Sequence, residues 1–441
     1  MRSPKAARAV AEESLDLYRF MSFGGFIGDA MNLKGITWLL LLCLSLCSSY
    51  GLEEEEDMEL ERQLKLINKT PLKTIQTAYG DVIDCIDIHK QLAFDHPLLK
   101  NHKIQMRPSF SFPLKGVTNE ASSMANQIRV GLKSKGCPTG TVPIRRTRKE
   151  DLQRSKTFAS IHPDTREVPG SLESTNTLKG FDSPPVTEIL FATLETLKPT
   201  NESDRLHGAK AHINVYNPRG AADQTSSGQM WVENGPFVNS NSKQAGWILS
   251  PPLYGDYRTH LFTAWTADGY HKTGCWNILC PGFVQVDKEV YLGEAFNNTS
   301  VYNGVQYDMM VHIYQDQATG NWWLVYTTDN IHVGYWPKSI FTDLAKGASK
   351  VSWGGRTSGA PEATSAEMGS GYLPDGNYHH ACYFRQIQFV NASYVLQDPD
   401  KYRTREIIDK PDCYDLKYYG DQGGVMGHTF LFGGPGGNCG S

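Results

Sequence analysis

Histidine and cysteine side chains gather in the stretch GNYHHACY, where His379, His380 and Cys382 could supply a nucleophile and its base. Successive residues of a strand point to opposite faces, so at most one of these histidines could share a face with Cys382. A serine nucleophile is also weakly supported, because MGSGY lacks the outer glycine of the G-x-S-x-G elbow. Neither nucleophilic hydrolase class is therefore indicated.

Metal and nucleic-acid binding are both disfavoured. The sequence has no C-x-x-C or H-E-x-x-H spacing, so zinc is not predicted and we expect no cofactor. The 43 Lys and Arg residues against 47 Asp and Glu residues leave a formal charge of -4. A basic surplus of the kind that attracts phosphate backbones is absent, so nucleic acid is not an expected partner.

Residues 31–51, MNLKGITWLLLLCLSLCSSYG, have the parts of a secretory signal peptide. A basic start precedes an apolar run from Ile36 to Leu46, and small residues follow near a cleavage point. A membrane anchor is the alternative, although the run is shorter than the ~20 residues that span a bilayer. We expect a secreted, extracellular or apoplastic protein that starts at Met31 and leaves the membrane after signal removal. Residues 1–30 form an upstream extension with no evident role.

Secretion favours disulfide pairing of the cysteines that follow the signal. The spacing GCWNILC predicts a Cys275–Cys280 bridge, and Cys413 with Cys439 would close the C-terminus. Cys85 and Cys137 then form an N-terminal pair, which leaves Cys382 as a buried thiol or an intermolecular partner. Glycosylation sequons fit a secreted surface. They occur at Asn68, Asn201, Asn297, Asn298 and Asn391.

The composition and spacing of apolar residues change along the chain. Apolar residues at helical spacing in DMELERQLKLINK predict a short amphipathic helix, and residues 72–146 hold enough hydrophobic residues for a small disulfide-linked domain. Residues 162–185 show no regular spacing of apolar residues, which indicates an exposed linker. From residue 186, short β-branched and aromatic segments alternate with Gly, Pro and Asn. This pattern predicts an all-β domain, either an antiparallel sandwich or a barrel.

Two blocks of motifs carry a family resemblance. AFDHPLLKNHKIQMRPS and CPTGTVPIRR resemble the activation peptide of the plant neprosin family. INVYNP, QAGW, LYGDYRTHLFTAWTADGYHKTGC, LCPGFVQ, GNWWL, VGYWP, WGG and MGSG resemble successive landmarks of the neprosin domain. The resemblance covers nearly everything from about residue 72 to 441, and it implies a secreted proenzyme whose main domain is a β-sandwich of two antiparallel sheets.

The resemblance also implies a chemistry. Family members with an assigned reaction are glutamic endopeptidases that cut next to proline in acid, and their two glutamates lie in landmarks reading E-A-G-W and W-G-G-E. The corresponding positions here are Gln244, in NSKQAGW, and Arg356, in VSWGGRT. A two-carboxylate hydrolase needs one base and one acid, with pKa values that are split. Glutamine can still donate a hydrogen bond to an oxyanion, but a guanidinium stays protonated and leaves the site without a base.

Other carboxylates could replace the missing base. Glu367, in TSAEMGSG, stands where the family usually carries glutamine, so Gln244 and Glu367 could form a relocated pair. Glu362 and Glu233 are further candidates, although surface charge is the commoner role for all three. An active acid peptidase therefore stays open as the alternative to a chain without peptidase activity.

Aromatic residues suggest a binding role that needs no acid. Aromatic walls dock polyproline II segments, and they also stack on sugars of the cell wall. Packing between the sheets is expected for at least half of the tryptophans. The residues predicted to line a groove are Trp247, Trp265, Tyr335, Trp336 and Trp353.

The sequence therefore predicts a signal peptide (31–51), an activation-peptide-like domain (52–161), a linker (162–185) and a β-sandwich (186–441). The function that we expect is binding of a peptide or proline-rich protein by an enzymatically impaired relative of glutamic endopeptidases. An active peptidase and a carbohydrate-binding cell-wall protein are the alternatives.

Overall fold

A computed structural model describes residues 55–112, 124–132, 136–161, 187–199, 201–326, 331–361 and 363–439. The predicted signal peptide, the upstream extension, the linker and Glu362 lie outside these residues. The chain divides into two units, Met1–Glu59 and Leu60–Ser441. Residues 55–67 are helical, as predicted, and Leu60 is buried. No helix in the described part of the chain is both long and apolar enough to cross a membrane.

One large sheet of the second unit has the strand order β10-β9-β8-β7-β15-β5-β18, and every neighbouring pair is antiparallel. Its long strands alternate small or apolar residues with polar ones, which gives the sheet two different faces. Its strands are β5 Glu188–Thr196, β7 Thr225–Asn234, β8 Asn241–Leu249, β9 Thr259–Thr266, β10 Cys275–Trp276, β15 Lys350–Gly359 and β18 Thr404–Ile408.

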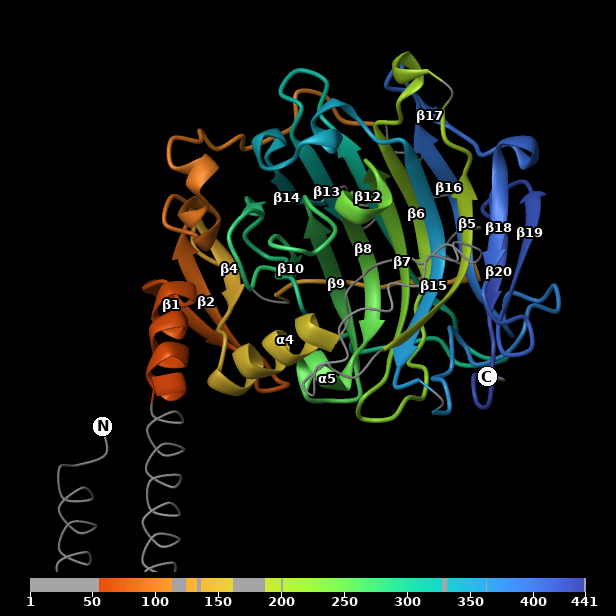
Figure 1. The fold of residues 1–441 in the computed structure, drawn as a ribbon, viewed down its shortest axis with the longest axis horizontal. Helices are drawn as coiled ribbons and strands as arrows, with labels where there is room; N and C mark the ends of the chain where they lie inside the picture. Colours follow the sequence, from red (N-terminus) through yellow and green to blue (C-terminus); the bar gives the residue numbers. More distant parts are fainter. Residues whose placement is uncertain are drawn as a thin grey trace, which may run out of the picture. The chain divides into compact units, whose positions relative to one another are not determined.

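A second sheet follows the order β11-β14-β13-β12-β6-β16-β20-β19, with β17 beside β16 and β3 beside β12 (Figure 1). The β3–β12 pair is parallel and the others are antiparallel. Its strands are β3 Asn126–Gln127, β6 Gly208–Asn214, β11 Val284–Gln285, β12 Tyr307–Gln315, β13 Trp322–Tyr326, β14 Ile331–Trp336, β16 Cys382–Val390, β17 Leu396–Gln397, β19 Asp415–Asp421 and β20 His428–Gly433.

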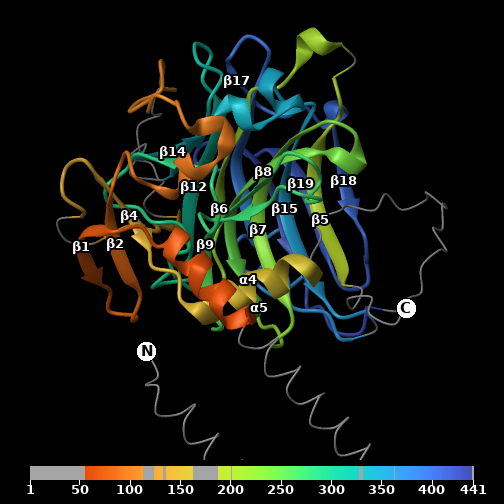
Figure 2. The same cartoon turned by 60° about the vertical axis from the view of Figure 1, so that its left-hand side comes forward.

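A small sheet, β1-β2-β4, is formed by strands in the N-terminal part of the chain. Figure 2 shows helices α4 and α5 side by side below the strands of the seven-stranded sheet. The elements are β1 Pro71–Gln76, β2 Val82–Asp87, β4 Thr141–Arg145, α4 Lys149–Ile161 and α5 Pro251–Tyr254. Short 3-10 turns are η1 Leu92–Asp95, η2 Pro97–Leu99, η3 Glu202–Asp204, η4 Phe237–Asn239, η5 Lys338–Ile340, η6 Asp343–Lys346 and η7 Lys401–Arg403.

The main core lies between the two large sheets and is rich in tryptophan, which corrects the predicted aromatic groove. Trp247, Trp336 and Trp353 are each 0 % exposed, and Trp265 is 3 % exposed, all within one buried cluster. Tyr335 is also 0 % exposed, in a separate cluster on the second sheet. The four tryptophans fill the sandwich because each occupies the inward position of its strand, where burial of a large apolar surface is most favourable. Tyr335 directly precedes Trp336 on β14 and therefore points to the opposite face of the second sheet.

The predicted cysteine pairing is confirmed. Disulfides join Cys85 to Cys137, Cys275 to Cys280 and Cys413 to Cys439. Cys382 is a buried free thiol, and its Sγ donates to the Asn214 carbonyl at 3.2 Å. Burial raises the pKa of this thiol, so it is suited to packing and not to nucleophilic chemistry.

The predicted sequons differ in their surroundings. Asn201, Asn297 and Asn298 are exposed. Asn68 is half-buried, and its side-chain amide donates to the Thr147 carbonyl at 2.8 Å. Asn391 is also half-buried. Glycosylation of these asparagines stays a prediction.

Candidate functional site

The face of the seven-stranded sheet that points away from the core carries Gln244 and Arg356. Directly paired residues on adjacent antiparallel strands share a face. Gln244 on β8 pairs with Trp231 on β7, which pairs with Ser352 on β15. Arg356 on β15 pairs with Ser227 on β7. Because residues two apart on a strand point the same way, Gln244 and Arg356 lie on one face, on strands separated by β7.

Gln244 is held by its neighbours on this face. It is 2 % exposed, and its Oε1 accepts a hydrogen bond from Gln229 Nε2 at 2.6 Å. Its Nε2 donates to the Tyr270 hydroxyl at 3.3 Å and to Ser242 Oγ at 3.4 Å. The amide is therefore oriented by three side chains, with its nitrogen donating and its oxygen accepting on the sheet face.

Arg356 is 3 % exposed, on a strand whose glycines bring other groups close. A Cβ atom added at Gly355 would collide with Met368 Sδ, so no larger residue fits there without displacement. The Arg356 side chain points to the opposite face of the sheet from this contact. Arg356 is also the register partner of Phe191 on β5. A permanently charged guanidinium thus takes the place on the face that the resemblance gives to a carboxylate.

Two glutamates share the face with Gln244: Glu233, which was one of the predicted candidates for the missing base, and Glu195, which the sequence analysis did not single out. Glu195 on β5 pairs with Ser352, and Glu233 on β7 pairs with Lys350. The Lys350 ammonium lies 3.0 Å from Glu233 Oε2 and 3.5 Å from Glu195 Oε1. This ammonium engages both carboxylates, which favours their ionised forms. Only the strand register could reveal this cluster, because its members are far apart in sequence.

Helix α4 packs on one end of this face. Phe158 of α4 is 0 % exposed and belongs to a cluster with Ile248 and Phe262. Its ring meets the Trp276 ring edge-on, with centroids 5.0 Å apart. Ile248 pairs with Ser227, so the helix covers the end of the sheet where the Arg356 row lies. This contact was not predicted, because the sequence analysis did not identify α4 as a separate element.

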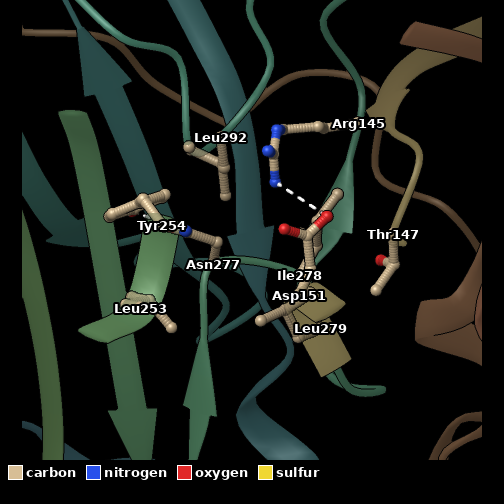
Figure 3. A pocket seen from close by; sticks show the side chains of 10 residues that line it. Arg145, Thr147, Asp151, Leu253, Tyr254, Asn277, Ile278, Leu279 and Leu292 are labelled. Atoms are coloured by element: carbon tan, nitrogen blue, oxygen red, sulfur yellow. Dashed lines mark hydrogen bonds and ion pairs between the residues drawn. The ribbon is translucent and has the colours of Figure 1, made fainter. Parts of the chain in front are cut away.

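The base of α4 is anchored by charge pairs around a cavity of about 30 Å³ (Figure 3). Arg145 Nε donates to Asp81 at 2.8 Å, and Arg145 Nη1 lies 3.6 Å from Asp151. On the sandwich side of the cavity, the Tyr254 hydroxyl accepts from Asn277 at 2.9 Å. The pKa of Arg145 is raised: burial opposes this shift, but Asp151 and Asp81 favour the charged form.

Glu367 is engaged elsewhere. Its carboxylate accepts from the Arg219 backbone at 2.8 Å and from Arg219 Nε at 2.7 Å. Among the described residues it has no hydrogen bond with Gln244, so the structure does not bring the predicted substitute pair together. Glu233 does lie on the site's face, bound to Lys350.

Several residues of the face escaped the sequence reasoning. Trp231 is 1 % exposed and faces the site side, unlike the tryptophans that were predicted to line a groove. Trp276 stacks on Tyr270 with ring centroids 5.4 Å apart. The motif TADGYHKTGCW contains both residues, so their proximity could have been inferred from its short turn.

No group of three or more His, Cys, Asp or Glu residues in the described part of the chain could hold a metal ion.

Together, the two large β-sheets, one of which carries a polar outer face, define an all-β protein. Residues 222–435 match the family model called Neprosin, and residues 74–186 match the model called Neprosin activation peptide. These matches span most of the chain, which belongs to the neprosin family, as the sequence motifs predicted.

Two solved structures show a distant likeness. Scytalido-glutamic peptidase with a peptide-based transition state analog is 12 % identical, with a TM-score of 0.31 over 56 % of this chain and 99 % of that chain. SCP-B, a member of the eqolisin family of peptidases in complex with the tripeptide Ala-Ile-His, is 11 % identical, with a TM-score of 0.31 over 56 % of this chain and 98 % of that chain.

Proposed function

We propose that this protein is a secreted, catalytically silent member of the neprosin family that binds extended, proline-rich peptide segments on the outer face of its seven-stranded sheet. One observation carries the proposal. The two face positions that correspond to the family's glutamates hold the Gln244 amide and the Arg356 guanidinium.

The chemistry of these two groups supports binding over hydrolysis. Peptide hydrolysis by a carboxylate pair needs a base that takes a proton from water and an acid that gives one to the leaving amine. Neither an amide nor a guanidinium can accept water's proton. Both can donate hydrogen bonds to a backbone carbonyl, and the hydrogen bond that Gln244 Oε1 accepts from Gln229 fixes the orientation of the Gln244 amide. These groups therefore suit recognition of a peptide backbone.

The alternative is an acid peptidase that uses Gln244 with a relocated carboxylate. The presence of Glu195 and Glu233 on the same face favours this alternative. Their shared ammonium, Lys350, opposes it, because the ion pairs occupy carboxylate oxygens that a general base would have to offer to water. Glu367 is a weaker candidate for the relocated carboxylate, because it is already bound to Arg219.

A peptidase assay separates the two functions. The secreted chain is incubated at acid pH with proline-containing peptides beside its Gln244→Glu, Arg356→Glu variant, with Arg356→Gln as the matched control for loss of charge. We expect no cleavage by the parent or by the control, and cleavage by the double variant once α4 is released. Cleavage by the parent that is lost in Glu233→Gln or Glu367→Gln would replace the proposal with the peptidase.

Binding is tested separately, by fluorescence anisotropy of a labelled proline-rich peptide. The expected result is saturable binding that weakens in Arg356→Gln. Binding of oligosaccharides in place of peptides would instead indicate the carbohydrate-binding alternative.

A further inference from the structure

A surface hollow of about 260 Å³ lies on the second sheet, away from the Gln244 face. Strands β16, β19 and β20 supply its walls together with the glycine-rich turn at 422–427 (strands in Figure 1). The side chains that line it include Gln386, Gln388, Asp398, Asp421 and His428.

The backbone is specially arranged at this hollow. The register of β16 against β6 shifts between Arg385 and Gln388, and Gln386 takes a left-handed φ of 49°. A non-glycine residue in that region costs about 1 kcal/mol or more, so surrounding contacts must hold it. Gln386 N donates to the Met426 carbonyl at 2.8 Å, and Gln386 Nε2 donates to the Val425 carbonyl at 3.1 Å. The bulge thereby turns the Gln386 side chain toward the glycine-rich turn.

Each of these lining side chains uses one polar atom in a hydrogen bond to the protein, and each has a second polar atom without such a bond to the described residues. Gln388 is 9 % exposed, and its Nε2 donates to Asp398 Oδ1 at 2.8 Å. Asp421 Oδ1 accepts from the Gly423 amide at 2.8 Å, and His428 Nδ1 bonds the Tyr418 hydroxyl at 2.6 Å. The remaining atoms have no hydrogen-bond partner among the described residues. These atoms are Oε1 of Gln386 and Gln388, Oδ2 of Asp398 and Asp421, and Nε2 of His428.

The remaining atoms are mainly acceptors, and the charge at the hollow is negative. Two carboxylates line it and no lysine or arginine does. Lys210 pairs with Gln388 across β6 and β16 but is not part of the lining. Burial, followed by the charges of Asp398, Asp400 and Asp421, raises the pKa of Tyr418 above its ordinary range. The ligand that complements such a site donates hydrogen bonds and is positively charged.

We propose that this hollow binds an organic cation through a primary ammonium or a guanidinium group, which donates to Asp398, Asp421 and Gln388. A metal ion fits less well, because the described residues provide no group of three suitable ligands. A sugar fits less well too, because no Trp, Tyr or Phe ring lines the hollow to stack on it. The cation could belong to a free polyamine or to a basic side chain of a peptide, since both present the same group.

Isothermal titration calorimetry of the full secreted chain tests the proposal. The probes are spermidine, an acetylated and amidated peptide with one lysine, calcium chloride and cellobiose. We expect spermidine, the lysine peptide or both to bind, with affinity that falls as salt rises. Binding of spermidine alone identifies a polyamine, and binding of both identifies recognition of the ammonium group. Heat from calcium or cellobiose only, or no heat from any probe, overturns the proposal.

Variants connect the binding to this hollow. Asp398→Asn with Asp421→Asn should weaken binding at least tenfold, and Asp421→Asn alone should give an intermediate loss. Asp412→Asn is the matched control, because Asp412 is exposed and does not line the hollow. Thermal melts check that each variant is folded. Unchanged affinity in the folded double variant, or equal loss in the control, contradicts the assignment.

Discussion

Lys243 is a lysine inside the sandwich core, and its replacement by methionine gives a sharp test of the structure. Its side chain is 0 % exposed, and its ammonium position lies 3.5 Å from the Phe341 ring centroid and 4.3 Å from the Trp322 ring centroid. Within the described part of the chain, Nζ has no hydrogen-bond partner. Burial therefore lowers the pKa of Lys243 well below its ordinary 10.5.

The lowered pKa of Lys243 makes the free energy of unfolding depend on pH. Between the folded and unfolded pKa values, the unfolded chain binds a proton that the folded chain does not. Stability of the parent then rises with pH by about 1.4 kcal/mol for each pH unit in that window, and reaches its full value above 10.5. Lys243→Met removes this proton and keeps the volume of the side chain. The variant should therefore be more stable than the parent, by a margin that shrinks as pH rises.

Urea denaturation of the parent and Lys243→Met, followed by tryptophan fluorescence at pH 7, 8 and 9, measures this margin. Lys198→Met is the matched control, because Lys198 is exposed. A margin that stays constant across these pH values would show that the amine reaches water, and would refute the buried placement. Lys243 directly precedes Gln244 on β8. Protonation of Lys243 in acid therefore destabilises the strand that carries Gln244.

Three further predictions follow from other contacts. Phe158→Ala removes the ring that packs on Trp276, so it should loosen α4 and increase its cleavage in limited proteolysis, whereas the exposed Lys156→Ala should not; equal cleavage of both variants would contradict the α4 contact. Burial and then Arg385 lower the pKa of His212 to about 4, so the folded chain should lose up to about 3 kcal/mol as pH falls from 6.5 to 4, and His212→Gln should flatten that slope in acid denaturation; an unchanged slope would count against a buried neutral His212. Removing the Cys413–Cys439 bridge, which closes a 26-residue separation, with a double serine variant should lower the free energy of unfolding by about 3.5 kcal/mol by the loop-entropy relation; no loss would mean that the C-terminus is held by other contacts.

Local sequence was enough to predict the strands, the class of fold and the cysteine pairs. Alternation of polar and apolar residues is a local property, and only seven cysteines follow the predicted signal peptide, which limits their possible partners. The identities of Gln244 and Arg356, and the loss of carboxylates at those positions, also follow from motifs that can be read without coordinates.

Which face of which sheet a side chain occupies was decided only by the tertiary structure. A strand's period of two divides its residues into two sets, but it does not say which set meets the other sheet. The sequence therefore could not separate Trp353 from Trp231. Packing of the sheets buries Trp353 in the core, whereas Trp231 lies on the outer face beside Gln244. The same holds for Lys350 between Glu195 and Glu233 and for Glu367 on Arg219. These contacts join residues that are distant along the chain, and local sequence carries no information on how distant strands come into register.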